Sequence, residues 1–196
     1  MSRPICPACR RPSSHCLCAL IPRLDSRTRV LILQHASESG HALNTARLAQ
    51  LGLNNAELRI GEHFAELSEL LDDPLYQPCL LFPGAEAELP TAQGPAARPL
   101  LLVVPDGTWR KARKLLYCNP VLEHLPRLRL PTGLESRYRL RKAPMPGALS
   151  TLEAIVETLN RLEVPARFDD LLRPFEALID GQIQAMGEDV FKRNHG

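Results

Sequence analysis

The stretch PDGTW, residues 105–109, places a carboxylate, a turn and an indole ring between an apolar run and a basic segment. Asp106 is a candidate acid–base group, because a carboxylate at the end of a strand can accept or steer a proton. Partial desolvation beside Trp109 would raise its pKa toward a useful value. The alternative interpretation makes Asp106 an ordinary turn or capping residue, and Trp109 a core residue of the helix that follows.

A strand and a helix would position this stretch. Residues 100–104 are apolar and predict a strand covered on both faces, which Pro105 ends because it has no N–H to donate. Gly107 continues the turn, and Thr108 stands where it can cap a helix predicted over 108–118. At about 100° per residue, one side of this helix carries cations and the other is apolar. The cations are Arg110, Lys111, Arg113 and Lys114, and the apolar side holds Trp109, Ala112, Leu115 and Leu116.

Four of the six cysteines form the pattern C-x2-C-x6-C-x-C, at Cys6, Cys9, Cys16 and Cys18. Two close pairs of thiols can converge on one tetrahedral ion, and Zn²⁺ is the usual choice for four sulfur ligands. The alternatives are disulfides, which are rare in cytosolic chains, and unrelated thiols. His15 offers a substitute for one sulfur. The spacing predicts a structural zinc site, and an apolar context predicts a buried thiol at Cys79.

The charge distribution suggests a polyanionic partner. Net charge is +2, yet residues 1–34 hold six Arg and one Asp, and residues 106–142 hold ten basic and three acidic residues. Two basic blocks in a nearly neutral chain favour a surface for nucleic acid, although charge runs are often solvated faces. No run is apolar enough to span a bilayer and no leader opens the sequence, which predicts a soluble cytoplasmic protein without a membrane partner.

The elements alternate along the chain and predict an α/β fold with a largely parallel sheet and flanking helices. A Cys-rich zinc-binding segment over 1–24 would precede one catalytic domain over 25–196. Strands are predicted over 29–35, 56–60, 78–84, 100–104 and 126–131. Helices are predicted over 44–53, 64–73, 108–118, 150–162 and within 168–193, with a long loop of strand-like centre over 132–148.

Five motifs together carry a family resemblance. CPACRRPSSHCLCALIPR, ILQHASESGHALNTARL, LLFPG, PDGTWRKARKLL and RYRLRKAPMPGALSTLEAI occur in this order. From about Cys6 to about Leu162 the chain resembles the DTW-domain family, whose Asp-x-Thr-Trp motif corresponds to Asp106, Thr108 and Trp109. The resemblance implies that these three residues are catalytic.

The resemblance also implies an activity and a fold. Family members transfer the 3-amino-3-carboxypropyl group of S-adenosylmethionine to N3 of a tRNA uridine and release methylthioadenosine. They look related to the SPOUT class of RNA-modifying enzymes, whose α/β fold contains a trefoil knot. Two rival functions remain open, an RNA methyltransferase that uses the same cofactor and a zinc-containing RNA-binding module without catalysis.

Strand ends and a helix start supply the candidate cofactor site. Gly84 lets backbone approach a ligand closely, and the helix start after residue 149 offers free N–H groups to a carboxylate. An ordinary turn and a capping box explain the same residues equally well. The cofactor candidates are Phe82, Pro83, Gly84, Pro105, Gly107, Ser150, Thr151, Leu152 and Glu153. The tRNA candidates are His35, Asn44, Arg110, Lys111, Arg113, Lys114, Arg137, Arg139 and Lys142.

Overall fold

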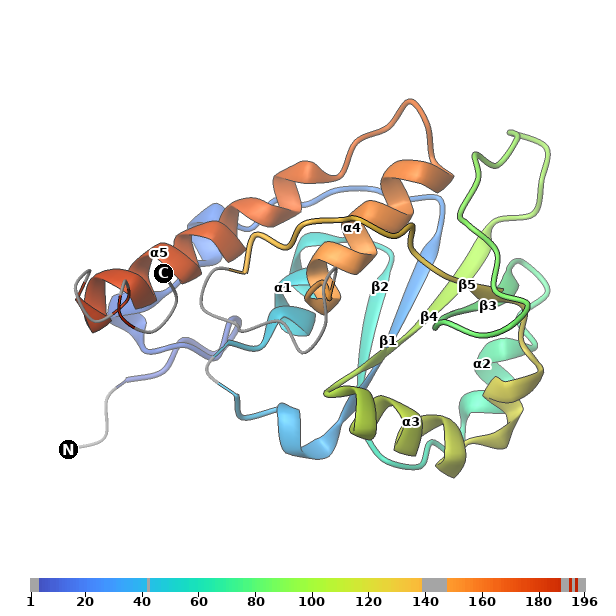
Figure 1. Cartoon of the computed structure of the whole chain (residues 1–196), viewed down its shortest axis with the longest axis horizontal. Helices are drawn as coiled ribbons and strands as arrows, with labels where there is room; N and C mark the ends of the chain where they lie inside the picture. Colours follow the sequence, from blue (N-terminus) through green and yellow to red (C-terminus); the bar gives the residue numbers. More distant parts are fainter. Residues whose placement is uncertain (1–3, 42, 139–147, 188–190, 192, 194–196) are drawn as a thin grey trace.

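A parallel sheet runs through the middle of the protein (Figure 1). The computed structural model describes residues 4–41, 43–138, 148–187, 191 and 193. Within these residues the sheet has five strands in the order β2-β1-β4-β3-β5. They are β1 (Arg29–His35), β2 (Ala56–Gly61), β3 (Gln77–Leu81), β4 (Leu100–Asp106) and β5 (Arg127–Leu128). All four strand pairings are parallel, so the predicted α/β class with a largely parallel sheet is confirmed.

Helices cover both faces of the sheet, as Figure 1 shows. One face packs against α1 (Thr45–Gly52), α4 (Thr151–Leu162) and α5 (Arg173–Met186). The opposite face packs against α2 (Leu67–Leu71) and α3 (Trp109–Cys118). The predicted helices over 44–53, 108–118 and 150–162 are confirmed to within a residue or two, with Asn44, Thr108 and Ser150 as their N-caps.

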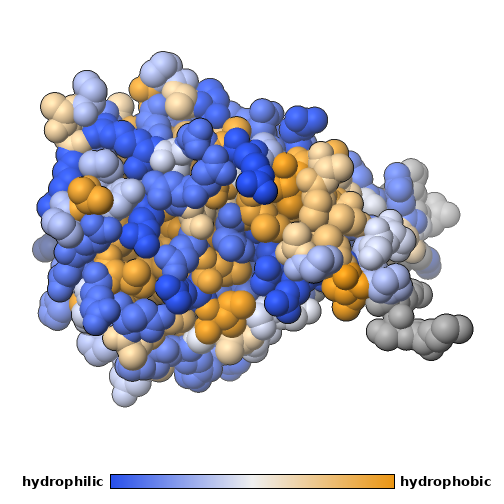
Figure 2. All heavy atoms as spheres, turned by 180° about the vertical axis from the view of Figure 1, so that it is seen from behind, coloured by the Kyte–Doolittle hydropathy of each residue, from blue (hydrophilic) through white to orange (hydrophobic). Residues whose placement is uncertain are grey.

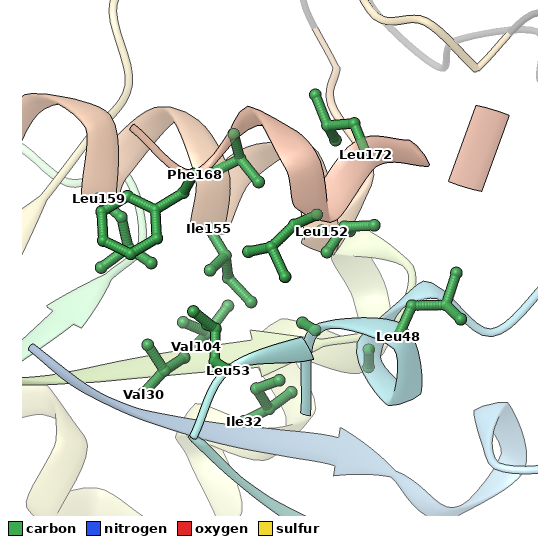
Figure 3. Packing of buried hydrophobic residues seen from close by; sticks show 14 of the residues in the cluster. Val30, Ile32, Leu48, Leu53, Val104, Leu152, Ile155, Leu159, Phe168 and Leu172 are labelled. Atoms are coloured by element: carbon green, nitrogen blue, oxygen red, sulfur yellow. The ribbon is translucent and has the colours of Figure 1, made fainter. Parts of the chain in front are cut away.

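The central strands are buried on both sides. Val30 and Ile32 of β1 point into the cluster formed with α1 and α4 (Figure 3). Leu31 and Leu33 belong to the second cluster, beneath α2 and α3. Because side chains alternate between the two faces of a strand, a strand with helices on both sides must be apolar throughout. Cys79 of β3 is 4% exposed, which confirms the predicted buried thiol.

The prediction that Pro105 ends its strand is wrong. The pairing of β4 with β1 continues through Leu33 with Pro105 and Gln34 with Asp106. The pairing of β4 with β3 stops at Val103, so Pro105 lies beyond the last residue on that side. A missing N–H there interrupts no ladder on the β3 side. As a consequence Asp106 is the last residue of a central strand.

Other boundaries differ where tertiary contacts intervene. The strand predicted over 78–84 ends at Leu81, and the Phe82 N–H donates to the carbonyls of Leu80 and Leu128. The helix predicted over 64–73 is shorter, since Asn119 Oδ1 accepts the Phe64 N–H and fixes the chain before it begins. Residues 132–138 contain no strand, and 139–147 lie outside the described residues. The knot stays a prediction, because the path from β5 to α4 includes that segment.

The N-terminal segment consists of short turns, including 3-10 helices over Ser13–His15 and Cys18–Leu20. Leu17 between them is buried in the cluster under α4 and α5, so the segment is anchored to the main core. The domain division after residue 24 stays a prediction. The predicted C-terminal helices are confirmed as a 3-10 turn over Asp169–Leu172 followed by α5.

The surface is mixed in character. The face in Figure 2 is largely hydrophilic, with groups of hydrophobic residues between the hydrophilic ones. Within the described part of the chain, no helix combines the length and the apolar character needed to cross a bilayer.

Candidate active site

Two neighbouring pockets open at the carboxyl ends of the strands, the second lined from β3, β4 and β5 and the first from the ends of β1 and β4. Strands β1 and β4 are adjacent in the sheet, but the helices that follow them, α1 and α3, cover opposite faces. The chain therefore leaves the two strand ends in opposite directions. This arrangement creates the crevice in which open α/β sheets commonly bind ligands.

The first, here called the polar pocket, has a volume of about 340 Å³. It lies between the ends of β1 and β4 and the starts of α1 and α4. Its described lining is Gln34, Glu38, His41, Leu43, Asn44, Thr45, Asp106, Gly107, Thr108, Tyr138, Ser150 and Thr151. Asp106 and Glu38 are carboxylates, and this described lining includes no Lys or Arg. Close to the Asp106 carboxylate, a neutral or cationic group is favoured over a phosphate.

The second, here called the apolar pocket, has a volume of about 410 Å³. It is lined by Leu81, Phe82, Pro83, Val104, Pro105, Gly107, Trp109, Ala112, 128–133, 148–151 and Ala154. Gly107, Ser150 and Thr151 line both pockets. A single ligand can therefore lie against apolar side chains on one side of these residues and approach Asp106 on the other.

Asp106 is 8% exposed and faces the polar pocket. Gln34 Nε2 donates to Asp106 Oδ2 at 2.7 Å. The Thr151 hydroxyl, at the start of α4, donates to Asp106 Oδ1. The two carboxylate oxygens are thus held by donors from different elements, and the side chain has a fixed orientation. A residue that only forms a turn does not need side-chain donors from two other elements, so this geometry favours a role for Asp106 in the pocket.

The turn after Asp106 depends on glycine. Gly107 has a φ of +153°, a backbone conformation that L side chains rarely adopt. A Cβ at this position would lie 3.0 Å from Lys111 Cβ and 3.6 Å from His35 Cβ. Thr108 Oγ1 accepts the Lys111 N–H at 3.4 Å and caps α3. The end of β4 therefore packs closely against α3 at Gly107, which lines both pockets.

Trp109 is 37% exposed, so its interpretation as a core residue is wrong. The indole lines the apolar pocket and meets Phe82 edge-on, with ring centroids 5.7 Å apart and planes at 64°. The remaining apolar residues of that helix face, Ala112, Leu115 and Leu116, are buried as expected. An indole at a pocket wall can contact a bound ring while its other side packs on the protein.

The predicted cofactor residues separate into two groups. Six of them line the apolar pocket, namely Phe82, Pro83, Pro105, Gly107, Ser150 and Thr151. Gly84 is outside its lining, and a Cβ there would lie 3.0 Å from Arg127 Cδ. Leu152 is fully buried in the core. Glu153 completes the capping box with Ser150 and accepts hydrogen bonds from Ser136 Oγ and the Arg137 N–H. Through these contacts Glu153 stabilises the start of α4 and holds residues 136–137 next to it.

Several of the cations predicted to bind tRNA are already paired with carboxylates of the protein. Lys111 Nζ lies 2.6 Å from Glu38 Oε1, and Lys114 Nζ lies 2.6 Å from Glu62 Oε2. The Lys114 ammonium, together with neighbouring His35, holds the pKa of Glu62 below its usual range.

Arg110 and Arg113 are exposed and have no carboxylate partner among the described residues. Arg137 pairs with Glu176 of α5. Arg139 and Lys142 lie outside the described residues.

His35 and Asn44 have different surroundings. His35 is 7% exposed; its Nε2 lies 2.8 Å from Glu62 Oε1, and its Nδ1 lies 3.0 Å from Ser37 Oγ. Asn44 lines the polar pocket and its Oδ1 accepts the Arg47 N–H, which caps α1. A role in binding tRNA stays a prediction for both.

Sequence reasoning missed Gln34 and Tyr138, which both line the polar pocket. Gln34 had one available signal, since it is a polar residue that closes the apolar run from Val30 to Leu33. Tyr138 had none, because its place depends on an edge contact with Phe175 of α5, with ring centroids 5.3 Å apart.

The four predicted cysteine ligands converge in space. Their sulfur atoms lie within 4.8 Å of one another, with 3.6 Å between Cys6 and Cys18 and 3.8 Å between Cys9 and Cys16. Four sulfurs about 2.3 Å from a tetrahedral Zn²⁺ lie about 3.8 Å apart, so the cluster fits zinc. These distances are too long for disulfides. His15 is not part of the cluster, and its Nδ1 lies 2.9 Å from Ser14 Oγ.

The thiols of this cluster differ in acidity. Backbone N–H groups of Cys9 and Ala8 lower the pKa of Cys6 to about 6, whereas burial raises the pKa of Cys18 to about 12. Because thiolates bind the metal, binding must displace protons and becomes weaker as pH falls.

We expect the purified protein to contain about one Zn²⁺ per chain, and to lose it more readily as pH falls, because protons compete with the metal for the four thiolates. Elemental analysis of protein purified without chelator measures the content. The double variant Cys9→Ser, Cys16→Ser should lose the metal, whereas Cys118→Ser, outside the cluster, should keep it. Equal zinc in all three proteins would contradict the assignment.

Together the fold and these pockets define an α/β protein with a ligand site at the switch point of a parallel sheet. A family model for the DTW domain matches residues 3–183, and the chain belongs to this family.

Curated relatives are similar in sequence to this chain over most of its length. It is 33% identical to "tRNA-uridine aminocarboxypropyltransferase 2" of Macaca fascicularis, over 98% of this chain and 68% of the relative. The protein of the same name from Drosophila melanogaster is 33% identical, over 91% of this chain and 74% of the relative. "tRNA-uridine aminocarboxypropyltransferase A" of Arabidopsis thaliana is 27% identical over 82% and 73%. No solved structure matches the chain.

Proposed function

We propose that this protein transfers the 3-amino-3-carboxypropyl group of S-adenosylmethionine to N3 of a uridine in tRNA. The DTW-domain match and the names of the curated relatives support the class of reaction. The observation that carries the proposal is the pair of pockets joined at Gly107, Ser150 and Thr151. A group transfer between two substrates needs two adjoining sites with the reacting atoms at their boundary.

The two pockets suit the two substrates. The apolar pocket, with Phe82 and Trp109 in its wall, would hold the nucleoside part of S-adenosylmethionine. The polar pocket would receive the uracil, which is neutral and carries the N3 proton. In this arrangement Ser150 and Thr151, at the start of α4, would contact the amino acid end of the donor.

The proposed chemistry requires positioning and one proton acceptor. Uridine N3 forms a bond to the side-chain carbon attached to the sulfonium, the carbon–sulfur bond breaks, and its electron pair leaves on the sulfur of methylthioadenosine. The N3 proton passes to Asp106, which is held beside this boundary by Gln34 and Thr151. The choice between the methyl and the aminocarboxypropyl carbon depends on which of them faces N3.

The tRNA would approach over α3. Arg110 and Arg113 are exposed on the first turns of this helix, next to Trp109 at the pocket wall. Phosphate contacts by such cations position an RNA without reading its sequence. The carboxylates of the polar pocket repel phosphate, so the base rather than the backbone would enter it.

Mass spectrometry of tRNA nucleosides after incubation with enzyme and S-adenosylmethionine tests this function. We expect a uridine carrying the aminocarboxypropyl group and an equal amount of methylthioadenosine. A methylated nucleoside with S-adenosylhomocysteine would identify a methyltransferase instead. Binding of tRNA with no product from any tRNA pool would favour a non-catalytic RNA-binding module.

A further inference from the structure

Gln34 is a buried amide at the centre of the polar pocket. It is 1% exposed and is the penultimate residue of β1. Its Nε2 donates to Asp106 Oδ2 at 2.7 Å and to Asn44 Oδ1 at 3.1 Å. A glutamine amide has two N–H donors, and in this site one is directed at the carboxylate.

Asn44 determines which end of the Gln34 amide faces Asp106. Asn44 Nδ2 donates to Gln34 Oε1 at 3.2 Å, and Asn44 Oδ1 accepts from both Gln34 Nε2 and the Arg47 N–H. Because the Arg47 N–H can only donate, the group of Asn44 that faces it must be the oxygen. The reciprocal amide pair then fixes the Gln34 nitrogen toward Asp106.

The surroundings of Asp106 favour its charged form from two sides. Gln34 donates to Oδ2 from β1, and Thr151 donates to Oδ1 from α4. Hydrogen bonds donated to a carboxylate stabilise the ionised state. Among the described residues that line this pocket, the other titratable groups are Glu38, His41 and Tyr138, and Glu38 is paired with Lys111. Trp109 lines the apolar pocket and is absent from the described lining of the polar pocket that Asp106 faces.

We propose that Gln34 is a positioning residue that keeps Asp106 ionised and oriented toward the polar pocket, oriented in turn by Asn44. The catalytic consequence, a carboxylate ready to receive the N3 proton, rests on the proposed function. The structural part of the inference does not depend on the reaction, because the hydrogen bonds are present in the protein alone.

The first test measures the carboxylate directly. The protein is labelled with ¹³C at the aspartate carboxyl carbons and titrated by NMR, with Asp106→Asn identifying the resonance. Gln34→Met retains length but has no donor, so the pKa of Asp106 should rise by about 1–2 pH units relative to the parent. Gln34→Glu, almost the same shape, should raise it at least as far, because two adjacent carboxylates share a proton.

A matched pair addresses the second donor and guards against a variant that fails to fold. Thr151→Ser retains the hydroxyl and should leave the Asp106 titration unchanged, whereas Thr151→Val should raise the pKa. An Asp106 titration that is the same in the parent, Gln34→Met and Gln34→Glu would overturn the proposal.

The second test uses the pH profile of single-turnover transfer. In Gln34→Met the acid limb should move to higher pH by the shift seen in NMR, with most of the rate recovered at high pH. A uniform loss at every pH would assign Gln34 a merely structural role and overturn the proposal. If the parent protein transfers no aminocarboxypropyl group, the proposed function fails, while the NMR titration still decides the role of Gln34.

Discussion

Replacing Asp106 by Asn is expected to lower single-turnover transfer by about 10²–10⁴-fold, the usual range for loss of a general base. The amide keeps the size of the carboxylate but cannot accept the uridine N3 proton at neutral pH. The measurement is the transfer rate with saturating tRNA and S-adenosylmethionine. Affinity for the donor, measured by titration, should change little.

The structure explains why Asp106→Asn should still fold. The oxygen of the introduced amide can accept from Gln34, and its nitrogen can donate to Thr151, because a hydroxyl rotates to act as an acceptor. Both hydrogen bonds are then retained, and the melting temperature should stay close to that of the parent. Asp170→Asn, at an exposed turn before α5, is the matched control. A variant at Asp106 that reacts at the parental rate would remove the catalytic assignment, whatever its stability.

Replacing Arg110 and Arg113 together by Ala should weaken tRNA binding about tenfold at moderate salt. The slope of log affinity against log salt should fall by about 2, roughly one for each arginine that no longer neutralises a phosphate. These two side chains are chosen because Lys111 and Lys114 on the same helix already pair with Glu38 and Glu62. Affinity for S-adenosylmethionine should be unaffected.

The control is a pair of arginines far from the pockets. Arg23 and Arg98 are exposed, precede β1 and β4, and have no carboxylate partner among the described residues, so Arg23→Ala, Arg98→Ala removes the same charge at the opposite end of these strands. Equal losses of affinity and of salt slope in both double variants would show that net charge alone matters, and that α3 is not the contact surface.

Much of the local structure follows from sequence because its causes act over short distances. Thr108 and Ser150 cap their helices through contacts three residues away, and Glu153 returns the hydrogen bond of the capping box. The apolar runs of β1 and β4 required helices on both faces of the sheet. The spacing of the four cysteines was sufficient to predict that their sulfurs meet.

The site itself was decided by tertiary structure. Gln34 and Asp106 are 72 positions apart and meet because β1 and β4 are neighbours in register. The pairing of Lys111 with Glu38 depends on the same adjacency, and it removes a cation that the helical pattern alone presents to solvent.

Two further features also depend on tertiary structure. Trp109 is exposed because it lines the apolar pocket beside α3, and β4 can continue through Pro105 because its pairing with β3 has already ended. Residue spacing specifies which side chains share a face of one element. It does not specify which elements become neighbours, because strand order is selected by the packing of the whole chain. The sequence by itself therefore determined the capped helices, the buried strands and the cysteine cluster, and only the tertiary structure placed Gln34 and Thr151 on Asp106.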